Sequence, residues 1–95
     1  MKSVLEREVD NSWDLNKDRI LRYLYDLHEN PFNYDDTPTQ AVRLGDELQL
    51  STRDANNILR LLVGEGLVEE INAAGTFYRI SPKGIETVER VLRKL

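Results

Sequence analysis

Hydrophobic residues recur every three or four positions over residues 15–29, the spacing that places them on one face of a helix. The members of this apolar stripe are Ile20, Leu21, Leu24 and Leu27. Asn16 is the expected N-cap, since its side chain can accept a hydrogen bond from the first helical turn. The helix is expected to end at Asn30, because the residue before Pro31 avoids the helical conformation.

Two helix-start signals coincide after the polar loop at residues 31–36. Thr37 and Gln40 have the spacing of a capping box, and Pro38 falls at the first helical position, where a missing N–H costs nothing. The helix predicted from there buries Ala41, Leu44 and Leu48.

Ser51 begins a further helix over residues 52–64, because it is a favourable N-cap with an acid, Asp54, three residues later. The predicted inward stripe is Ala55, Ile58, Leu59 and Leu62. Gly66 is the expected stop. Only two residues separate this helix from the preceding one, so the chain must turn sharply, as it does in a helix-turn-helix.

Residues 67–71 and 76–80 are rich in β-formers and flank a four-residue loop at 72–75 that contains a glycine. This pattern predicts a β-hairpin. Ser81 and Pro82 then open a last helix. Its apolar stripe is Ile85, Val88, Leu92 and Leu95.

The first residues repeat an apolar side chain every four positions, at Met1, Leu5, Val9 and Trp13. This spacing favours either a short amphipathic helix that packs on a partner surface or a frayed terminus. We therefore divide the chain into an N-terminal extension, residues 1–14, and a single domain, residues 15–95.

Composition narrows the class of protein. The 95 residues are 40% hydrophobic, enough for one small core, and the absence of Cys excludes disulfides and thiolate metal sites. No apolar run is long enough to cross a bilayer and no signal peptide is visible, so we expect a soluble cytoplasmic protein. The net charge of −4 arises in residues 1–36, which hold five Lys/Arg against nine Asp/Glu. An anion-binding surface is therefore expected in residues 37–95.

Catalytic and metal-binding patterns are missing from the sequence. His28 is the only histidine, and Asp35 and Asp36 are adjacent acids without a spaced third ligand. The two glycines at positions 64 and 66 read as a helix stop, since no strand precedes them and no helix follows at the spacing of a phosphate loop. We expect no enzymatic activity, no cofactor and no metal.

The order helix, helix, helix, hairpin, helix resembles the winged helix-turn-helix family, and MarR-type and PadR-type transcription regulators in particular. Three stretches carry the likeness: residues 44–51 for the supporting helix and turn, 62–68 for the exit from the recognition helix, and 78–84 for the return strand. The resemblance implies an α+β, mostly helical fold. It consists of a three-helix core, a two-stranded wing and a C-terminal helix, with a short N-terminal helix as an addition.

The resemblance also implies a DNA-binding transcriptional regulator whose third helix reads the major groove of double-stranded DNA. Arg can donate two hydrogen bonds to guanine, and Asn can pair with adenine. The expected DNA-binding residues are Thr52, Arg53, Asn56, Asn57, Arg60, Arg79 and Lys83. Because one chain offers few cations, we expect a homodimer. The expected dimer interface comprises Leu5, Val9, Trp13, Val88, Leu92 and Leu95.

Several acids argue for an alternative. Asp54 stands at the front of the third helix, Glu69 and Glu70 lie on the first wing strand, and the wing tip at 72–75 has no Lys or Arg. Carboxylates near phosphates are repelled, so a winged-helix protein-interaction module without DNA binding is the second reading. A regulator that senses an effector is a third, and it would need a pocket at a dimer interface.

Overall fold

The computed structural model describes residues 4–30 and 38–94, and the side chains from residue 15 onward. Its elements are α1 (Val4–Glu29), α2 (Ala41–Leu48), α3 (Thr52–Gly64), β1 (Val68–Ala73), β2 (Gly75–Ile80) and α4 (Pro82–Arg93). This order confirms the helical core, the hairpin and the C-terminal helix predicted from the sequence.

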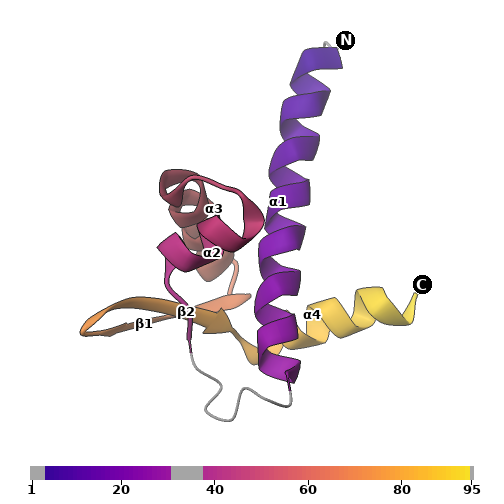
Figure 1. Cartoon of the computed structure of the whole chain (residues 1–95). Coiled ribbons are helices and arrows are strands. Elements are labelled where there is room, and N and C mark those ends of the chain that lie inside the picture. The colour runs from indigo at the N-terminus through magenta and orange to yellow at the C-terminus, as the bar shows by residue number, and fades with distance from the viewer. Residues whose placement is uncertain (1–3, 31–37, 95) are drawn as a thin grey trace.

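The first helix differs from the prediction because it is continuous from Val4 to Glu29. Asn16 therefore lies in mid-helix and is not an N-cap, and its side-chain oxygen accepts a hydrogen bond from Arg19 at 3.1 Å. The 26 residues of α1 extend over about 39 Å at 1.5 Å per residue, longer than the core that they cross. In Figure 1 the N-terminal part of α1 rises beyond the rest of the molecule.

The start of α2 also differs from the prediction. Thr39 exchanges two backbone hydrogen bonds of 2.8 Å with Tyr78, forming an isolated β-bridge beside the hairpin. This pairing keeps the backbone extended, so the helix begins only at Ala41, with Gln40 as an N-cap that makes no side-chain hydrogen bond. The capping box expected at Thr37 and Gln40 is therefore wrong, since a long-range pairing overrides the local signal; Thr37 itself lies outside the described residues.

The turn between α2 and α3 is sharp, as predicted. Gln49 takes the left-handed conformation, with φ of 59°, and the N–H of Leu50 donates to the carbonyl of Gly45 at 2.8 Å. Ser51 caps α3, its Oγ accepting a hydrogen bond from the N–H of Asp54 at 3.0 Å. The predicted inward stripe of α3 is confirmed, because Ala55, Ile58, Leu59 and Leu62 are all buried.

The hairpin is tighter than predicted. The antiparallel register pairs Val68 with Ile80 and Ala73 with Gly75, so that only Ala74 is left between the strands. Gly75 allows this turn through its positive φ of 123°. Val68, Tyr78 and Ile80 are the buried residues of the two strands.

The exit of α3 is interlocked with the start of α4. Three successive carbonyls, those of Glu65, Gly66 and Leu67, accept hydrogen bonds from Lys83 Nζ, Ser81 Oγ and Ser81 N at 3.0, 2.6 and 3.0 Å. Ser81, which was predicted to open α4 together with Pro82, is the N-cap of this helix, since its Oγ accepts from the N–H of Gly84 at 3.0 Å. The end of α3, the hairpin and the start of α4 are thus joined at one point.

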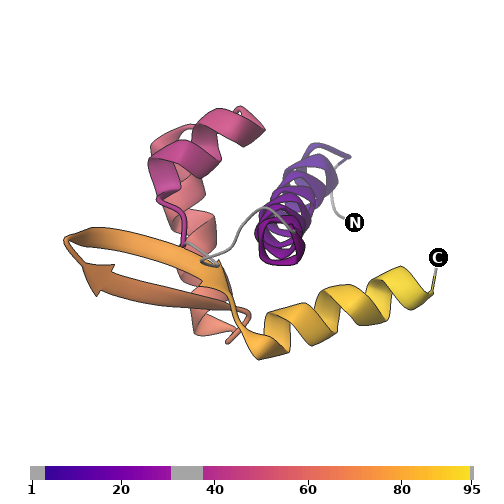
Figure 2. The ribbon, with the colours of Figure 1, turned by 60° about the horizontal axis from the view of Figure 1, so that its bottom comes forward.

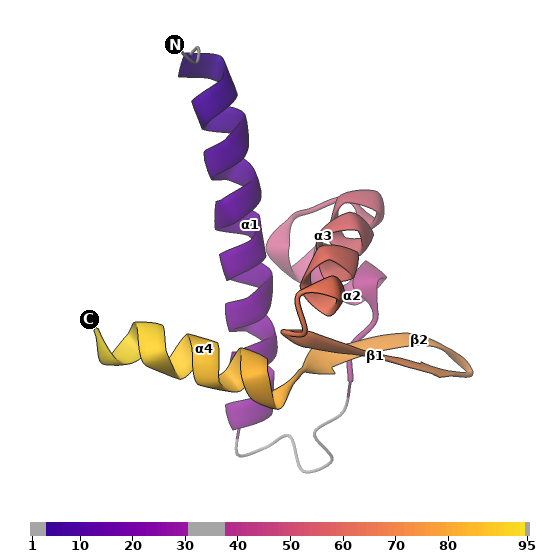
Figure 3. The same ribbon diagram turned by 180° about the vertical axis from the view of Figure 1, so that it is seen from behind.

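The core lies where α1 crosses the other elements. α1 contacts α2, α3, α4 and β2, and its residues Ile20, Leu21 and Leu24 are buried there. The hairpin projects to one side of α1 and α4 to the opposite side (Figures 1 and 2). The view from behind in Figure 3 shows the same arrangement, with α3 in front of α2.

Candidate nucleic-acid interface

The outward face of α3 is the candidate interface. Thr52, Arg53, Asn57 and Arg60 are exposed, and Asn56 is half-buried. The helix periodicity that buries the apolar stripe turns these polar residues toward solvent. Neither arginine has a side-chain hydrogen bond or ion pair with any residue that the structure describes. The structure thus brings five of the predicted residues together on one helix.

Asp54 lies beside this face at the start of the helix. Its backbone N–H binds the capping Ser51, and its carboxylate lies in the first turn, where a negative charge interacts favourably with the helix dipole. The acid therefore has a stabilising role within α3, although it also lowers the positive potential of the face.

The two predicted residues outside α3 have partners within the chain. Arg79 lies opposite Glu69 in the hairpin and forms an ion pair with it at 3.4 Å. Lys83 binds the carbonyl oxygen of Glu65 at the end of α3. Sequence spacing could not reveal either contact, since both depend on how the hairpin and α4 fold back.

The hairpin contacts α3, and its Tyr78 lies near Arg60. The hydroxyl of buried Tyr78 donates to Glu70 at 3.3 Å. Burial first, and then the negative charge of Glu70, raise the pKa of the Tyr78 hydroxyl, while the nearby charge of Arg60 opposes this shift. The Arg60 guanidinium therefore lies close enough to the hairpin for its positive charge to act on the Tyr78 hydroxyl.

Two features of α3 were missed in the sequence. Leu61 belongs to an apolar run, but it is 46% exposed because it lies on a different side of the helix from the buried stripe. Glu65, just after the helix, pairs with Lys17 of α1 at 3.0 Å. A helical projection of residues 52–65 would have separated Leu61 from the core; the ion pair had no signal in the sequence.

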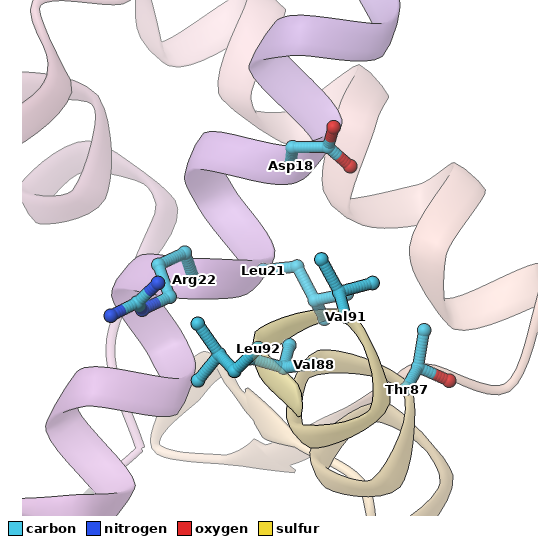
Figure 4. Close-up of a pocket in the computed structure, with 7 residues that line it drawn as sticks. All are labelled: Asp18, Leu21, Arg22, Thr87, Val88, Val91 and Leu92. Carbon is cyan, nitrogen blue, oxygen red and sulfur yellow. The ribbon is translucent and has the colours of Figure 1, made fainter. Parts of the chain in front are cut away.

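A groove of about 210 Å³ runs between α1 and α4. Figure 4 shows Leu21 from α1 and Val88, Val91 and Leu92 from α4 converging there, with charged Asp18 and Arg22 from α1 around them. Val88 is buried and Leu92 half-buried, whereas Val91 is 56% exposed. Of the other predicted interface residues, Leu5, Val9 and Trp13 belong to the part of α1 whose side chains are not described, and Leu95 lies outside the described residues.

The described residues form neither a cluster of metal ligands nor a membrane-spanning helix. Among the side chains that the structure describes, in residues 15–30 and 38–94, no three His, Cys, Asp or Glu come together as metal ligands would. None of the described helices combines the length and the apolar character needed to cross a bilayer. Phe32, Tyr34, Asp35 and Asp36 lie outside the described residues.

Solved structures with a similar fold include a transcription regulator and a MarR family protein. MepR, a transcription regulator of the Staphylococcus aureus multidrug efflux pump MepA, is 19% identical, with a TM-score of 0.62 over 95% of this chain and 73% of that chain. A MarR family protein from Bacillus stearothermophilus is 15% identical, with a TM-score of 0.57 over 95% and 68%. A variant of ZitR from Lactococcus lactis is 13% identical, with a TM-score of 0.58 over 78% and 49%.

These likenesses establish the winged-helix fold of MarR-family regulators. No protein-family model matches the sequence, and no curated protein matches it. The chain spans between about half and three quarters of the length of the three structures.

Proposed function

We propose that this protein is a DNA-binding transcriptional regulator that reads the major groove with α3. One observation carries the proposal: the second helix of a helix-turn-helix presents Arg53, Asn57 and Arg60 to solvent without side-chain partners among the described residues. The fold shared with transcription regulators supports it. Such a protein would work in the cytoplasm, as the sequence predicts.

The exposed side chains suit the edges of base pairs. Arg53 and Arg60 can each donate two hydrogen bonds to guanine, while Asn57 and, at the edge of the face, Asn56 can pair with adenine. Thr52 and the free N–H groups of the first turn of α3 suit a phosphate, since the positive end of the helix dipole lies there. The α3 face therefore combines side chains that can read bases with one site for a phosphate of the DNA backbone.

Arg79 and Lys83 remain proposed backbone contacts despite their internal partners. An exposed ion pair such as Arg79–Glu69 is worth only about 0–1 kcal/mol, so a phosphate can compete with the carboxylate. Lys83 can keep its bond to the carbonyl of Glu65 and still present the remaining N–H groups of its ammonium. Both contacts would add affinity without sequence preference.

We further propose a homodimer built from α1 and α4. Val91 is exposed beside the α1–α4 groove, and the N-terminal part of α1, with Leu5, Val9 and Trp13, projects beyond the core in Figures 1 and 3. A symmetric dimer would cover these surfaces and double the number of cations that face DNA. Val88 already packs within its own chain, so Val91 and Leu92 are the α4 residues left for a partner.

A protein-interaction module is the second candidate. It is favoured by one observation, the Arg79–Glu69 pair, which neutralises the only cation of the two wing strands. A wing of this kind offers DNA no free positive charge, and the acids of the strand suit a basic protein surface.

Fluorescence anisotropy of labelled duplexes from the neighbourhood of the gene distinguishes the two candidates. The titration is run at about 50 mM and about 200 mM salt; neutralising about four phosphates would weaken binding about a hundredfold over this range. A salt-sensitive affinity that differs between duplexes supports the regulator. No binding at the lower salt concentration would favour the interaction module.

A further inference from the structure

Leu61 is the one apolar residue of α3 that the core does not cover. The other apolar residues of the helix are buried or half-buried, whereas Leu61 is 46% exposed. It lies one turn after Asn57 and directly after Arg60, two residues proposed to read bases. A leucine in this position has a different chemistry from every other residue proposed to face DNA.

The helical geometry places Leu61 on the flank of the reading face. At about 100° per residue, Leu61 lies about 40° around the axis from Asn57, on the side toward α1. The side toward the wing is occupied by Arg60, near Tyr78. Glu65 lies on the same flank as Leu61, but its carboxylate is paired with Lys17 at 3.0 Å, which lowers the repulsion of an approaching phosphate.

This part of the surface is open. Gly64 is exposed one turn after Arg60, and a methyl group added there would meet no atom within 4 Å. No other element of the described chain therefore lies against α3 at Gly64. A duplex that reaches Asn57 and Arg60 can also reach the leucine.

Among the groups that base pairs present in the major groove, the C5 methyl of thymine is the apolar one. It lies toward the backbone of its own strand, so a residue on the flank of a reading helix is placed to contact it. Asn57 and Arg60, which have no side-chain partners among the described residues, lie next to the leucine and suit DNA better than an apolar protein surface.

We propose that Leu61 recognises a thymine methyl group beside the bases read by Asn57 and Arg60. The contact rests on the proposed DNA binding and makes it more specific: the preferred duplexes carry thymine at a fixed position in each half-site. Burying one methyl group corresponds to about a fourfold gain in affinity.

The experiment begins with selection of the tightest duplexes from a random library by the full-length protein. Each thymine of a selected duplex is then replaced by deoxyuridine, which removes only the methyl group, and binding is measured by anisotropy for the wild type, Leu61→Ala and Leu61→Gln. We expect one thymine per half-site whose replacement weakens wild-type binding about fourfold and leaves the affinities of both variants unchanged. Val42→Ala, at an exposed position of α2, is the matched control and should keep the wild-type response.

The experiment distinguishes failure of the Leu61 contact from failure of the proposed DNA binding. If removing the thymine methyl also weakened binding by both Leu61 variants, another residue would contact that methyl group, and the proposal would be overturned. Binding that no deoxyuridine weakens would overturn it as well, while leaving the DNA-binding function standing. Failure to bind any duplex at low salt would overturn both.

Discussion

Arg19 of α1 donates a hydrogen bond from Nη2 to the carbonyl oxygen of Leu48, the last residue of α2, at 2.6 Å. That carbonyl belongs to the last turn of the helix, whose carbonyls lack intrahelical donors. The guanidinium is held in turn by Asn16 at 3.1 Å. Because the turn of the helix-turn-helix begins at Gln49, α1 fixes the point from which α3 departs.

Replacing Arg19 with Met should therefore lower the free energy of unfolding by about 1 kcal/mol, the usual size of a net hydrogen-bond contribution at an exposed site. Chemical denaturation monitored by circular dichroism measures this change. Arg22→Met is the matched control, since Arg22 pairs with Asp26 within α1 only and both side chains are more than half exposed. That variant should lose no more than about 0.5 kcal/mol. Equal losses in the two variants would contradict the capping role of Arg19.

Arg53 and Arg60 should matter more for DNA binding than Arg79 and Lys83. Each arginine of α3 that reads a base is expected to contribute about 1–3 kcal/mol, so Arg53→Ala and Arg60→Ala should each raise the Kd about five- to a hundredfold on the best duplex. Arg79→Ala should weaken binding to all duplexes by a smaller and uniform factor. Anisotropy titrations on one selected and one scrambled duplex test this order. If every variant weakened binding to the selected and the scrambled duplex by the same factor, α3 would not read bases.

Three glycines should respond differently to alanine because their surroundings differ. At Gly64 a Cβ meets nothing, so Gly64→Ala should stabilise the protein by about 0.5–1 kcal/mol through the lower entropy of the unfolded chain. At Gly45 the Cβ would lie 2.7 Å from the carbonyl oxygen of Leu50, and at Gly84 it would overlap that of Leu67. These two variants should lose about 1–3 kcal/mol. Thermal unfolding checks the series, and stabilisation by Gly45→Ala would refute the close packing at the turn.

A dimer through the α1–α4 surface should be sensitive to Val91. Val91→Asp would bury a carboxylate in the interface and should convert a dimer into a monomer at micromolar concentration, as measured by sedimentation equilibrium. Val42→Asp, at a similarly exposed position on α2, should leave the mass of the assembly unchanged. A wild-type mass of one chain would exclude the dimer outright.

The stability of the protein should fall at high pH, in part through Tyr78. Because burial raises the pKa of its hydroxyl in the folded state, the folded protein holds this proton more tightly than the unfolded chain. The resulting stability is present below about pH 10 and is lost as the pH rises through the folded-state pKa. Between about pH 9 and pH 11, the free energy of unfolding of Tyr78→Phe should fall less steeply than that of the wild type. Parallel slopes would show that the hydroxyl does not contribute.

Local signals in the sequence were sufficient for most of the elements. The period of Ala55, Ile58, Leu59 and Leu62 predicted which face of α3 is buried, because side chains four residues apart must lie on the same side of a helix. Ser51 was predicted as an N-cap and Ser81 was predicted to open α4. These signals are local, because the capping hydrogen bond reaches only three residues ahead. The exposed polar residues of α3 followed from the same period.

Tertiary structure decided whatever depends on residues distant in the chain. The pairing of Thr39 with Tyr78 moved the start of α2, and contacts with α3 and β1 gave Lys83 and Arg79 their partners. The ion pair of Glu65 with Lys17, 48 residues apart in the chain, likewise depends on how α1 passes the end of α3. A sequence pattern reveals the hydrophobic period of one helix or strand. Which residues of other elements contact that helix or strand is determined by tertiary packing.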